Sequence, residues 1–320
     1  MRSDTVAAQP RPSYPPSVAG AASRLLIDAI AHLAAGTSFE IAARNIGALD
    51  GARAALAPGT LIGITWLPGD THDHRVAAAR AVREAGFEPM PHIAARRLVD
   101  GRDADTLAGR LADEAGVRQL LVIGGDVAAP AGEFGSALEL LARLRLAHRG
   151  YRRVGVAGHP EGHAAVDRAV MESELDTKIA VIEDAGAEAF VVTQFGFDAA
   201  PILDWLEAFR ARGYAAEVRV GLAGPASLRT LLRYARICGV GASARAVLGH
   251  HGSLARLLRE TGPDAVIRAL ACARARERFA PVFLHLFPFG GLLQTARWIA
   301  PVAHGRVTLH PNGSGFEPKG

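Results

Sequence analysis

This sequence has little cysteine, no long apolar run and no concentration of charge of one sign. Its 320 residues include two cysteines, Cys238 and Cys272, with neither a Cys-x-x-Cys pair nor a Cys/His ligand spacing. Disulfides and structural zinc are therefore not expected. The formal net charge is +4, but Lys and Arg are dispersed along the chain. The charge therefore indicates solubility and weak attraction for anionic ligands, and nucleic acid is not expected as a partner.

Signal and membrane-spanning patterns are missing as well. The first twenty residues are rich in Pro, Ser and Ala and lack the cationic start and continuous apolar run of a signal peptide. No later apolar run reaches the roughly 20 residues needed to span a bilayer. We expect a soluble, cytoplasmic protein without a membrane partner, and the sequence leaves a homo-oligomer open.

What the chain does contain is a regular alternation of two patterns. Apolar residues make up 49% of the sequence, enough for one large core. Short apolar, β-branched runs alternate with helical stretches, which is typical of parallel strands joined by crossover helices. The eight predicted strands lie at approximately 37–41, 61–65, 88–93, 119–124, 153–157, 189–194, 217–222 and 282–287.

Apolar residues recur at spacings of three and four between these strands, for example at 105–115, 134–149 and 200–212. Eight strand–helix units predict a single-domain α/β fold, the (β/α)8 TIM barrel. A doubly wound sheet is the alternative, because Gly239–Ala244 superficially resembles a dinucleotide-binding fingerprint. That segment follows a helical run at 228–237 and not a strand, so a helix-to-helix turn is predicted there.

The predicted barrel occupies residues 20–303. About sixty residues separate the seventh and eighth strands, which is too long for one crossover helix and predicts two or three helices. Residues 1–19 are expected to be a flexible N-terminal segment, and residues 304–320 a loosely held C-terminal tail.

Polar residues stand at the carboxyl ends of six predicted strands, which is where a barrel of this kind carries its active site. Singly, each has an ordinary explanation, such as a helix cap or a core histidine with satisfied hydrogen bonds. Together on one rim they need partners that an apolar barrel mouth lacks, so we expect a ligand with many hydrogen-bonding edges. The six are Glu40, Thr65, His92, Asp126, His159 and Gln194.

Glu40 is the residue best suited to acid–base chemistry. It lies between Phe39 and Ile41 on an inner strand, where desolvation should raise its pKa toward the range of a general acid. The alternative role is a salt bridge across the barrel. Gly124-Gly125-Asp126 permits close approach of backbone to a ligand and offers a carboxylate, although it lacks the Gly-Lys-Ser/Thr ending of a P-loop.

The other histidines do not predict a metal site. His159 and His163 stand four apart, but Pro160 and Gly162 make the continuous helix of a zincin improbable, and no further ligand falls at a suitable spacing. We therefore expect no metal. Surface positions are expected for His72 and His74, in a polar loop, and for His250 and His251, in a helical region.

The polar residues occur within motifs that resemble, in order, those of the methylenetetrahydrofolate reductase family over about residues 37–300. Three motifs near the start resemble the family's Ser-Phe-Glu, Pro-His and Gly-Asp, and three later ones resemble its Tyr-Pro-Glu-Gly-His, Asp-Ala-Gly-Ala and Thr-Gln-Phe. In this chain they are Ser38–Glu40, Pro91–His92, Gly125–Asp126, His159–His163, Asp184–Ala187 and Thr193–Phe195.

The resemblance implies a (β/α)8 barrel that binds FAD at the strand ends and interconverts 5,10-methylenetetrahydrofolate and 5-methyltetrahydrofolate, in one-carbon metabolism and methionine biosynthesis. Hydride would pass between flavin N5 and the folate carbon, with NADH or NADPH as the electron donor. Glu40 would be the general acid that opens the bridged ring, Asp126 would contact the pterin and lie near the flavin, and Gln194, with Phe195 beside it, would bind the pterin. The flavin would be lined by Thr65, His92, Gly125, Asp126, His159, His163 and Lys178.

The chain also departs from the family pattern. Ile41–Arg44 replaces Phe-Phe-Pro-Pro, Gly124 stands in place of an arginine, and His159 in place of a tyrosine. The set that contacts the ribityl or phosphate groups is changed around Leu175–Lys178. Val220–Pro225 replaces Pro-Gly-Ile-Met-Pro, and the last strand reads His285–Phe289 in place of Tyr-Thr-Leu-Asn.

The changes at the seventh and eighth strands leave the electron donor open. Two alternatives therefore stand beside the reductase. One is an enzyme that oxidises methyltetrahydrofolate with an acceptor other than a nicotinamide. The other is a non-catalytic folate-binding or assembly subunit.

Overall fold

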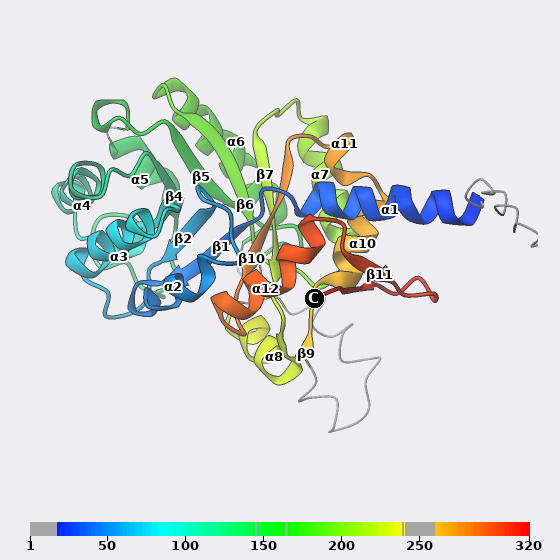
Figure 1. Cartoon of the computed structure of the whole chain (residues 1–320). Helices are drawn as coiled ribbons and strands as arrows, with labels where there is room; N and C mark the ends of the chain where they lie inside the picture. The colour runs from blue at the N-terminus through cyan, green and yellow to red at the C-terminus, as the bar shows by residue number, and fades with distance from the viewer. Residues whose placement is uncertain (1–17, 145, 164–165, 239, 241–259) are drawn as a thin grey trace, which may run out of the picture.

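The computed structural model describes residues 18–144, 146–163, 166–238, 240 and 260–320. Within these residues, eight parallel strands close into a barrel in the order β1-β10-β7-β6-β5-β4-β3-β2 (Figure 1). The predicted (β/α)8 barrel is confirmed, each predicted strand agrees to within one residue at either end, and the doubly wound alternative is wrong. The barrel strands are β1 (Ser38–Ala42), β2 (Leu61–Thr65), β3 (Glu88–Ala94), β4 (Gln119–Ile123), β5 (Arg153–Gly158), β6 (Glu188–Thr193), β7 (Glu217–Ala223) and β10 (Val282–Phe287).

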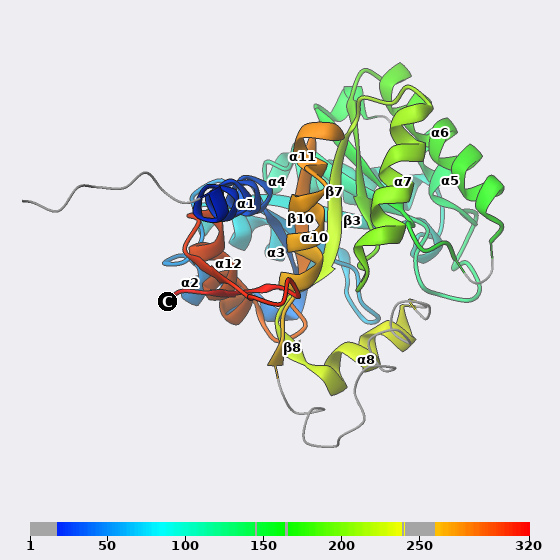
Figure 2. The ribbon, with the colours of Figure 1, turned by 90° about the vertical axis from the view of Figure 1, so that its right-hand side faces the viewer.

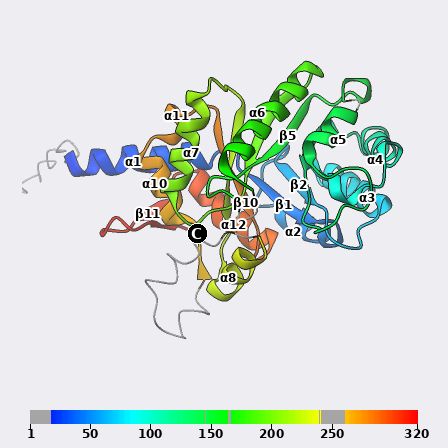
Figure 3. The same cartoon turned by 180° about the vertical axis from the view of Figure 1, so that it is seen from behind.

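Helices cover the outside of the barrel, and α7, α6, α5 and α4 follow one another around its far side (Figure 3). They begin at capping residues: Asp198 caps α7 and Ser227 caps α8, each accepting a backbone N–H. The described helices are α1 (Val18–Ala34), α2 (Ala48–Ala52), α3 (His72–Glu84), α4 (Gly101–Glu114), α5 (Ala137–Arg143), α6 (Arg168–Asp184), α7 (Ala199–Ala211), α8 (Leu228–Ile237), α10 (Asp264–Cys272), α11 (Ala275–Arg278) and α12 (Leu292–Ala303).

The predicted helix at 134–149 is wrong in its extent. Ser136 caps α5, and the helix ends where Leu144 takes an extended backbone conformation, after which a short 3-10 turn, η3 (Ala147–Arg149), completes the segment. The predicted run at 228–237 is confirmed as α8. The turn expected at 239–244 lies, apart from Val240, outside the described residues. None of the described helices combines the length and apolarity required to cross a bilayer.

The barrel interior is filled in two layers below its carboxyl end. Apolar side chains from four strands, among them Met90, Leu121 and Phe190, occupy the middle. At the amino end, Glu217 lies 2.9 Å from Arg153 Nη2 and 2.7 Å from Arg219 Nε. The barrel is therefore a packed core and not a pore, and a barrel of this kind carries its site at the carboxyl end.

Between β7 and β10 the chain leaves the simple strand–helix repeat. A short strand pair, β8 (Ala226–Ser227) with β9 (Glu260–Thr261), brackets α8, and α10 and α11 return the chain to the barrel. The prediction of two or three helices here agrees with the three that are described. Figure 2 shows α8 beyond the carboxyl ends of the strands, with α11 at the opposite end.

The C-terminal segment is not a loosely held tail, and that expectation is wrong. β11 (Val307–Leu309) and β12 (Phe316–Pro318) form an antiparallel pair. Phe316 is 1% exposed, its ring centroid lies 6.0 Å from that of Trp298 on α12, and its N–H donates to Asp264 on α10. Apolar residues at 307 and 316 thus anchor the hairpin to the helices. The expected flexible segment 1–19 lies, except for the start of α1 at Val18, outside the described residues.

Candidate active site

Glu40 lies on the inner face of β1, at the carboxyl end of the barrel, in contact with two histidines. Its carboxylate Oε1 is 3.1 Å from His285 Nε2 on β10 and 3.3 Å from His92 Nε2 on β3. All three side chains are buried. β1 pairs directly with β10, whereas β2 lies between β1 and β3. The carboxylate of Glu40 therefore contacts imidazoles that come from both sides of β1.

Gly63 makes this convergence possible. It is the β2 residue in register with Glu40. A Cβ atom at this position would lie 3.2 Å from Glu40 Cγ and 3.2 Å from His92 Nε2. A side chain there would separate the two groups, so the absence of one on β2 lets β1 and β3 make contact across it.

His285 is held on its other side by Ser38. Ser38 Oγ lies 2.8 Å from His285 Nδ1 and 3.4 Å from the carbonyl oxygen of Leu284. Both Ser38 and His285 are fully buried, and they are opposite one another in the β1–β10 register. The sequence analysis gave neither residue a role at the site, because their partnership depends on strands at opposite ends of the chain.

Arg75 on α3 is a second group that the sequence analysis missed. It is fully buried, and its guanidinium donates to the carbonyl oxygens of Thr65 (3.0 Å), Ile64 (3.4 Å) and His92. The guanidinium carbon lies 4.4 Å from the centre of the Trp66 ring. Burial lowers the pKa of Arg75 to about 9, so it stays charged at neutral pH. It joins the carboxyl ends of β2 and β3 and so positions the backbone of His92.

The charge state of Glu40 differs from the expectation. Burial raises its pKa, but the nearby His92 and the hydrogen bond with His285 lower it by more, and the net direction is downward. The predicted upward shift is therefore wrong, because the carboxylate has two imidazole neighbours and not only apolar ones. Burial lowers the pKa of His92 to about 4, so this ring is neutral at neutral pH.

We predict that the protein loses stability as the pH falls from about 6.5 to about 4. Burial lowers the pKa values of His92 and His159 from 6.5 to about 4. The unfolded chain therefore takes up protons in this window while the folded protein does not. Each histidine contributes stability that is complete above pH 6.5 and is lost toward pH 4, up to about 3 kcal/mol.

Urea unfolding at a series of pH values measures this effect. His159→Phe should flatten the dependence, whereas the same change at the exposed His74 should leave it as in the wild type. A free energy of unfolding that stays constant between pH 7 and pH 4.5 would contradict the prediction.

Asp126 and Gln194 do not contact Glu40. Asp126 has a side chain that is 70% exposed, and its Oδ1 lies 2.5 Å from Arg97 Nη2, on the 3-10 turn η2 (Ala95–Arg97) that follows β3. Gln194 follows β6, and its Oε1 accepts the N–H of Phe195 at 3.0 Å. Asp126 and Glu40 nevertheless have a common neighbour: burial, and then the charges of Glu40 and Asp126, raise the pKa of Cys238 to about 11.

The residues expected to line a flavin fall into three groups around the rim. Thr65 and His92 lie on β2 and β3, and Thr65 Oγ1 donates to the carbonyl of Ile41 at 3.2 Å. Gly125, with a φ of +102°, and Asp126 follow β4. At the third point the rings of His159 and His163 have centroids 5.9 Å apart. Lys178 also belongs there: it lies near enough to His159 to help lower its pKa, although its Nζ is 2.7 Å from Glu174.

The histidines expected at the surface, and those weighed as metal ligands, show ordinary arrangements. His74 takes part in the capping box of α3 with Thr71, and His72 Nε2 lies 3.4 Å from Asp103, so both belong to the first turn of a helix and not to a loop. His250 and His251 lie outside the described residues. Over the part of the chain that the structure describes, no three His, Cys, Asp or Glu side chains gather as a metal site would require.

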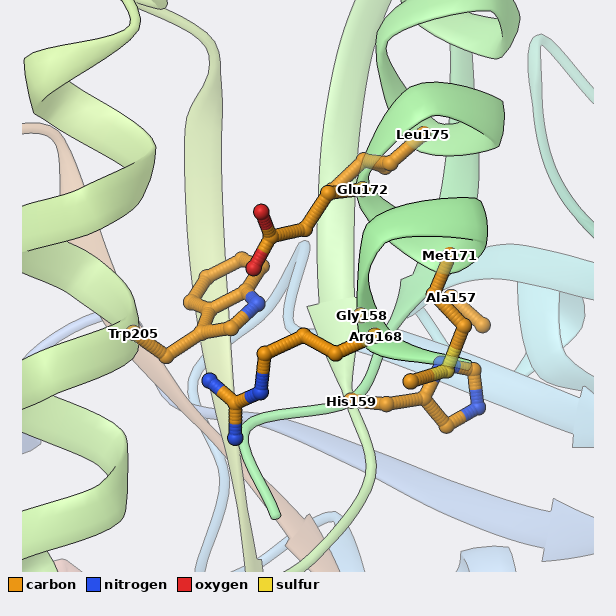
Figure 4. A pocket seen from close by; sticks show the side chains of 8 residues that line it. All are labelled: Ala157, Gly158, His159, Arg168, Met171, Glu172, Leu175 and Trp205. Carbon is orange, nitrogen blue, oxygen red and sulfur yellow. The ribbon is translucent and has the colours of Figure 1, made fainter. Parts of the chain in front are cut away.

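A crevice beside His159 is too small for a cofactor. It lies between β5, α6 and α7 and is lined by residues that include Arg168, Glu172 and Trp205 (Figure 4). Its volume of about 20 Å³ suits a single water molecule.

Aromatic rings cover the side of the mouth formed by β6, β7 and β10. Phe195 is 1% exposed, and its ring centroid lies 5.0–5.6 Å from those of Phe197, Phe287 and Phe289. Tyr234 of α8 stacks on Phe289 with centroids 4.0 Å apart. Phe195, expected beside the substrate, is thus buried within this cluster, and the half-buried rings of Phe197, Phe287 and Phe289 lie around it.

Comparison with known proteins places these residues in a family. The family model for methylenetetrahydrofolate reductase matches residues 50–245, which include Thr65, Asp126 and Gln194 but neither Glu40 nor His285. Methylenetetrahydrofolate reductase 1 of Schizosaccharomyces pombe is 27% identical over 187 residues, which are 56% of this chain and 30% of the yeast protein. The matched part of this chain thus spans less than a third of that relative.

Among solved structures, one with a TM-score above 0.5 shares the fold at low sequence identity. An uncharacterized protein from Clostridium thermocellum that binds two copies of 5-methyl-5,6,7,8-tetrahydrofolic acid has a TM-score of 0.54 and 9% identity, covering 82% of this chain and 95% of its own. A dihydropteroate synthase from Burkholderia cenocepacia has a TM-score of 0.45 and 16% identity, covering 82% and 88%. Because the family model matches more than half of the chain, this protein belongs to the methylenetetrahydrofolate reductase family.

Proposed function

We propose that the protein is a flavin-dependent oxidoreductase that interconverts 5,10-methylenetetrahydrofolate and 5-methyltetrahydrofolate, with Glu40 as the general acid. The observation that carries this proposal is a buried carboxylate, contacted by His285 and His92, at the carboxyl end of a barrel of this family. The methyltetrahydrofolate bound by the Clostridium thermocellum protein of the same fold supports a folate ligand.

The residues at the mouth fit FAD as the cofactor. Among the described residues, His92 Nε2, Arg96 Nε and Arg97 Nε are buried without a hydrogen-bond partner. All three lie on β3 and η2, beside Thr65 and Asp126. Buried nitrogen atoms without a hydrogen-bond partner suit a ligand that is rich in acceptor atoms and carries negative charge. Arg97 also brings a cation to Asp126 where Gly124 replaces the family's arginine.

The allocation of residues follows from these contacts. FAD would be held by Thr65, His92, Gly125, Asp126, His159, His163 and Lys178, and when bound it would supply hydride transfer. The chain's own residues bind and orient the folate and move the proton. Gln194 would exchange its bond to the N–H of Phe195 for the donor and acceptor edge of the pterin. Glu40 would give a proton to the folate nitrogen that leaves the one-carbon bridge.

A second candidate keeps the same site but oxidises methyltetrahydrofolate with an acceptor other than a nicotinamide. The observation that favours it is the aromatic cluster at the ends of β6, β7 and β10, where α8 stacks Tyr234 on Phe289. The resemblance implies that the ends of β7 and β10 help to bind the nicotinamide donor and the folate, so packed rings there leave less room for a nicotinamide.

The absorption spectrum of the protein tests the proposal. We expect a flavin band after purification or after incubation with FAD, and anaerobic loss of that band with methyltetrahydrofolate. Rapid bleaching by NADH or NADPH would favour the reductase, and bleaching by methyltetrahydrofolate alone would favour the second candidate. Protein that binds folate but shows no flavin band under any of these conditions would reject both candidates and support a non-catalytic folate-binding subunit.

A further inference from the structure

We propose that His285, oriented by Ser38, is a positioning residue that keeps Glu40 Oε1 occupied, so that Glu40 exchanges its catalytic proton with the ligand through Oε2 alone. This inference rests on the proposed function of Glu40. It adds a role for β10, which lies outside the residues matched by the family model.

The tautomer of His285 follows from Ser38. The hydroxyl has one proton and two neighbouring acceptors. The distance to His285 Nδ1 is 2.8 Å, a normal hydrogen-bond length, whereas 3.4 Å to the Leu284 oxygen is longer than a good O–H···O bond. Ser38 therefore donates to Nδ1. A neutral imidazole that accepts at Nδ1 carries its proton on Nε2.

The Nε2 proton of His285 then lies between His285 and Glu40. Nε2 is 3.1 Å from Oε1, and two acceptors would repel each other at this distance. The N–H of His285 donates to Oε1, which makes Oε1 the fixed oxygen of the carboxylate. Among the described residues, the hydrogen bond to the Glu40 side chain is made at Oε1, and none is made at Oε2.

His92 does not share this role, although it lies almost as close. Its Nε2 is 3.3 Å from the same Oε1, but it makes no hydrogen bond of good geometry within the described part of the chain. The carbonyl of His92 is held by Arg75, whose charge disfavours an imidazolium at this position. The two histidines can therefore be compared directly, because His285 is hydrogen-bonded to Glu40 whereas His92 is only adjacent to it.

The proton transfer can be written with its atoms balanced. In the ligand-bound state Oε2 carries a proton taken from water. The Oε2–H bond breaks as a new N–H bond forms on the folate nitrogen, and the C–N bond of the bridge gives its electron pair to that nitrogen. Glu40 becomes a carboxylate, and His285 keeps its Nε2 proton throughout. The other ionisable groups that face Glu40 are His92 on β3, with Arg75 of α3 behind it, and Cys238 after α8.

Nitrogen NMR of the protein labelled at histidine tests the tautomer without any need for turnover. The His285 resonances are assigned by their loss in His285→Gln. At pH 8 we expect a protonated Nε2 and an unprotonated Nδ1, and a change at Nδ1 in Ser38→Ala. A protonated Nδ1, whether as the other tautomer or as an imidazolium, would overturn the inference even if the enzyme proves to be a reductase.

Kinetics of the variants tests the effect on Glu40. His285→Phe removes the donor to the carboxylate, which raises the pKa of Glu40. In a plot of kcat against pH, the fall on the basic side should therefore move about one unit to higher pH, and kcat should drop about tenfold. His285→Gln keeps an N–H for Oε1 and should stay within about threefold of wild type. Equal losses in both variants, with normal thermal unfolding, would overturn the positioning role.

His92→Gln alters the other imidazole without removing the bond to Oε1. Because His92 would also line the flavin, the kcat of this variant is expected to fall, and only the pH of the basic limb is compared. Its kcat pH profile should keep the wild-type limb. A shift as large as that of His285→Phe would assign the role to the pair as a whole and reject His285 as the specific determinant. If no variant and no wild-type sample turns over, the proposed function fails, while the NMR result still decides the tautomer.

Discussion

Glu40→Gln is expected to lower turnover by about a hundredfold to ten-thousandfold while leaving folate binding and the fold intact, because general acid catalysis contributes this much. Glutamine has nearly the same shape and can still accept the N–H of His285 at its carbonyl oxygen. It cannot carry an exchangeable acidic proton at the position of Oε2. Steady-state kcat and calorimetric folate binding, measured on the same sample, separate the loss of chemistry from the loss of affinity.

Glu188→Gln is the control for this experiment. Glu188 begins β6 at the amino end of the barrel, its side chain is 61% exposed, and its contact is with Arg153. It should retain wild-type kcat. Unchanged turnover in Glu40→Gln would remove Glu40 from the mechanism, whereas a wild-type protein with folate binding but no turnover would leave only the non-catalytic subunit.

Arg75→Met is expected to cost about 3 kcal/mol of unfolding free energy, the second large effect that the structure predicts. The substitution keeps an unbranched apolar stem but leaves the carbonyl oxygens of Thr65, Ile64 and His92 without their donor in a buried place. Part of that loss is offset because a buried charge is also removed. Urea unfolding monitored by tryptophan fluorescence measures the change.

Arg80→Met, on the same helix, provides the comparison. The side chain of Arg80 is 51% exposed, and its partner is Glu114 at 3.5 Å, so its removal should change stability by no more than about 0.5 kcal/mol. If the two variants unfold at the same urea concentration, the carbonyl network of Arg75 does not stabilise the strand ends in the way its geometry indicates.

The barrel could be predicted from the sequence because each of its units has a local pattern. A buried parallel strand is a short apolar, β-branched run, and a covering helix repeats its apolar residues every three or four positions. These patterns located all eight strands. They failed where the structure depends on contact with a distant element: Phe316, in the expected tail, is held by Trp298 and Asp264. They also failed at α5, where one extended residue, Leu144, ends the helix.

The candidate site was predictable only in outline. Barrel topology brings the carboxyl ends of all strands to one rim, so Glu40, Asp126 and Gln194 were expected on the same side of the molecule. Their separate environments were not predictable. Asp126 is exposed beside Arg97, and the side chain of Gln194 accepts the backbone N–H of Phe195. The carboxylate of Glu40 has two imidazole neighbours that lower its pKa, where an apolar pocket would have raised it.

The sequence alone determined the number and order of the strands, the end of the barrel that carries polar groups, and the resemblance to one family, because these depend on residue types along a single stretch of chain. Only the tertiary structure decided which groups touch. Glu40 meets His285 because the first and last strands of the barrel close the ring, and it meets His92 because Gly63 places no side chain between them. Protonation depends on distances of a few ångströms between such groups, and those distances exist only after the ring has closed.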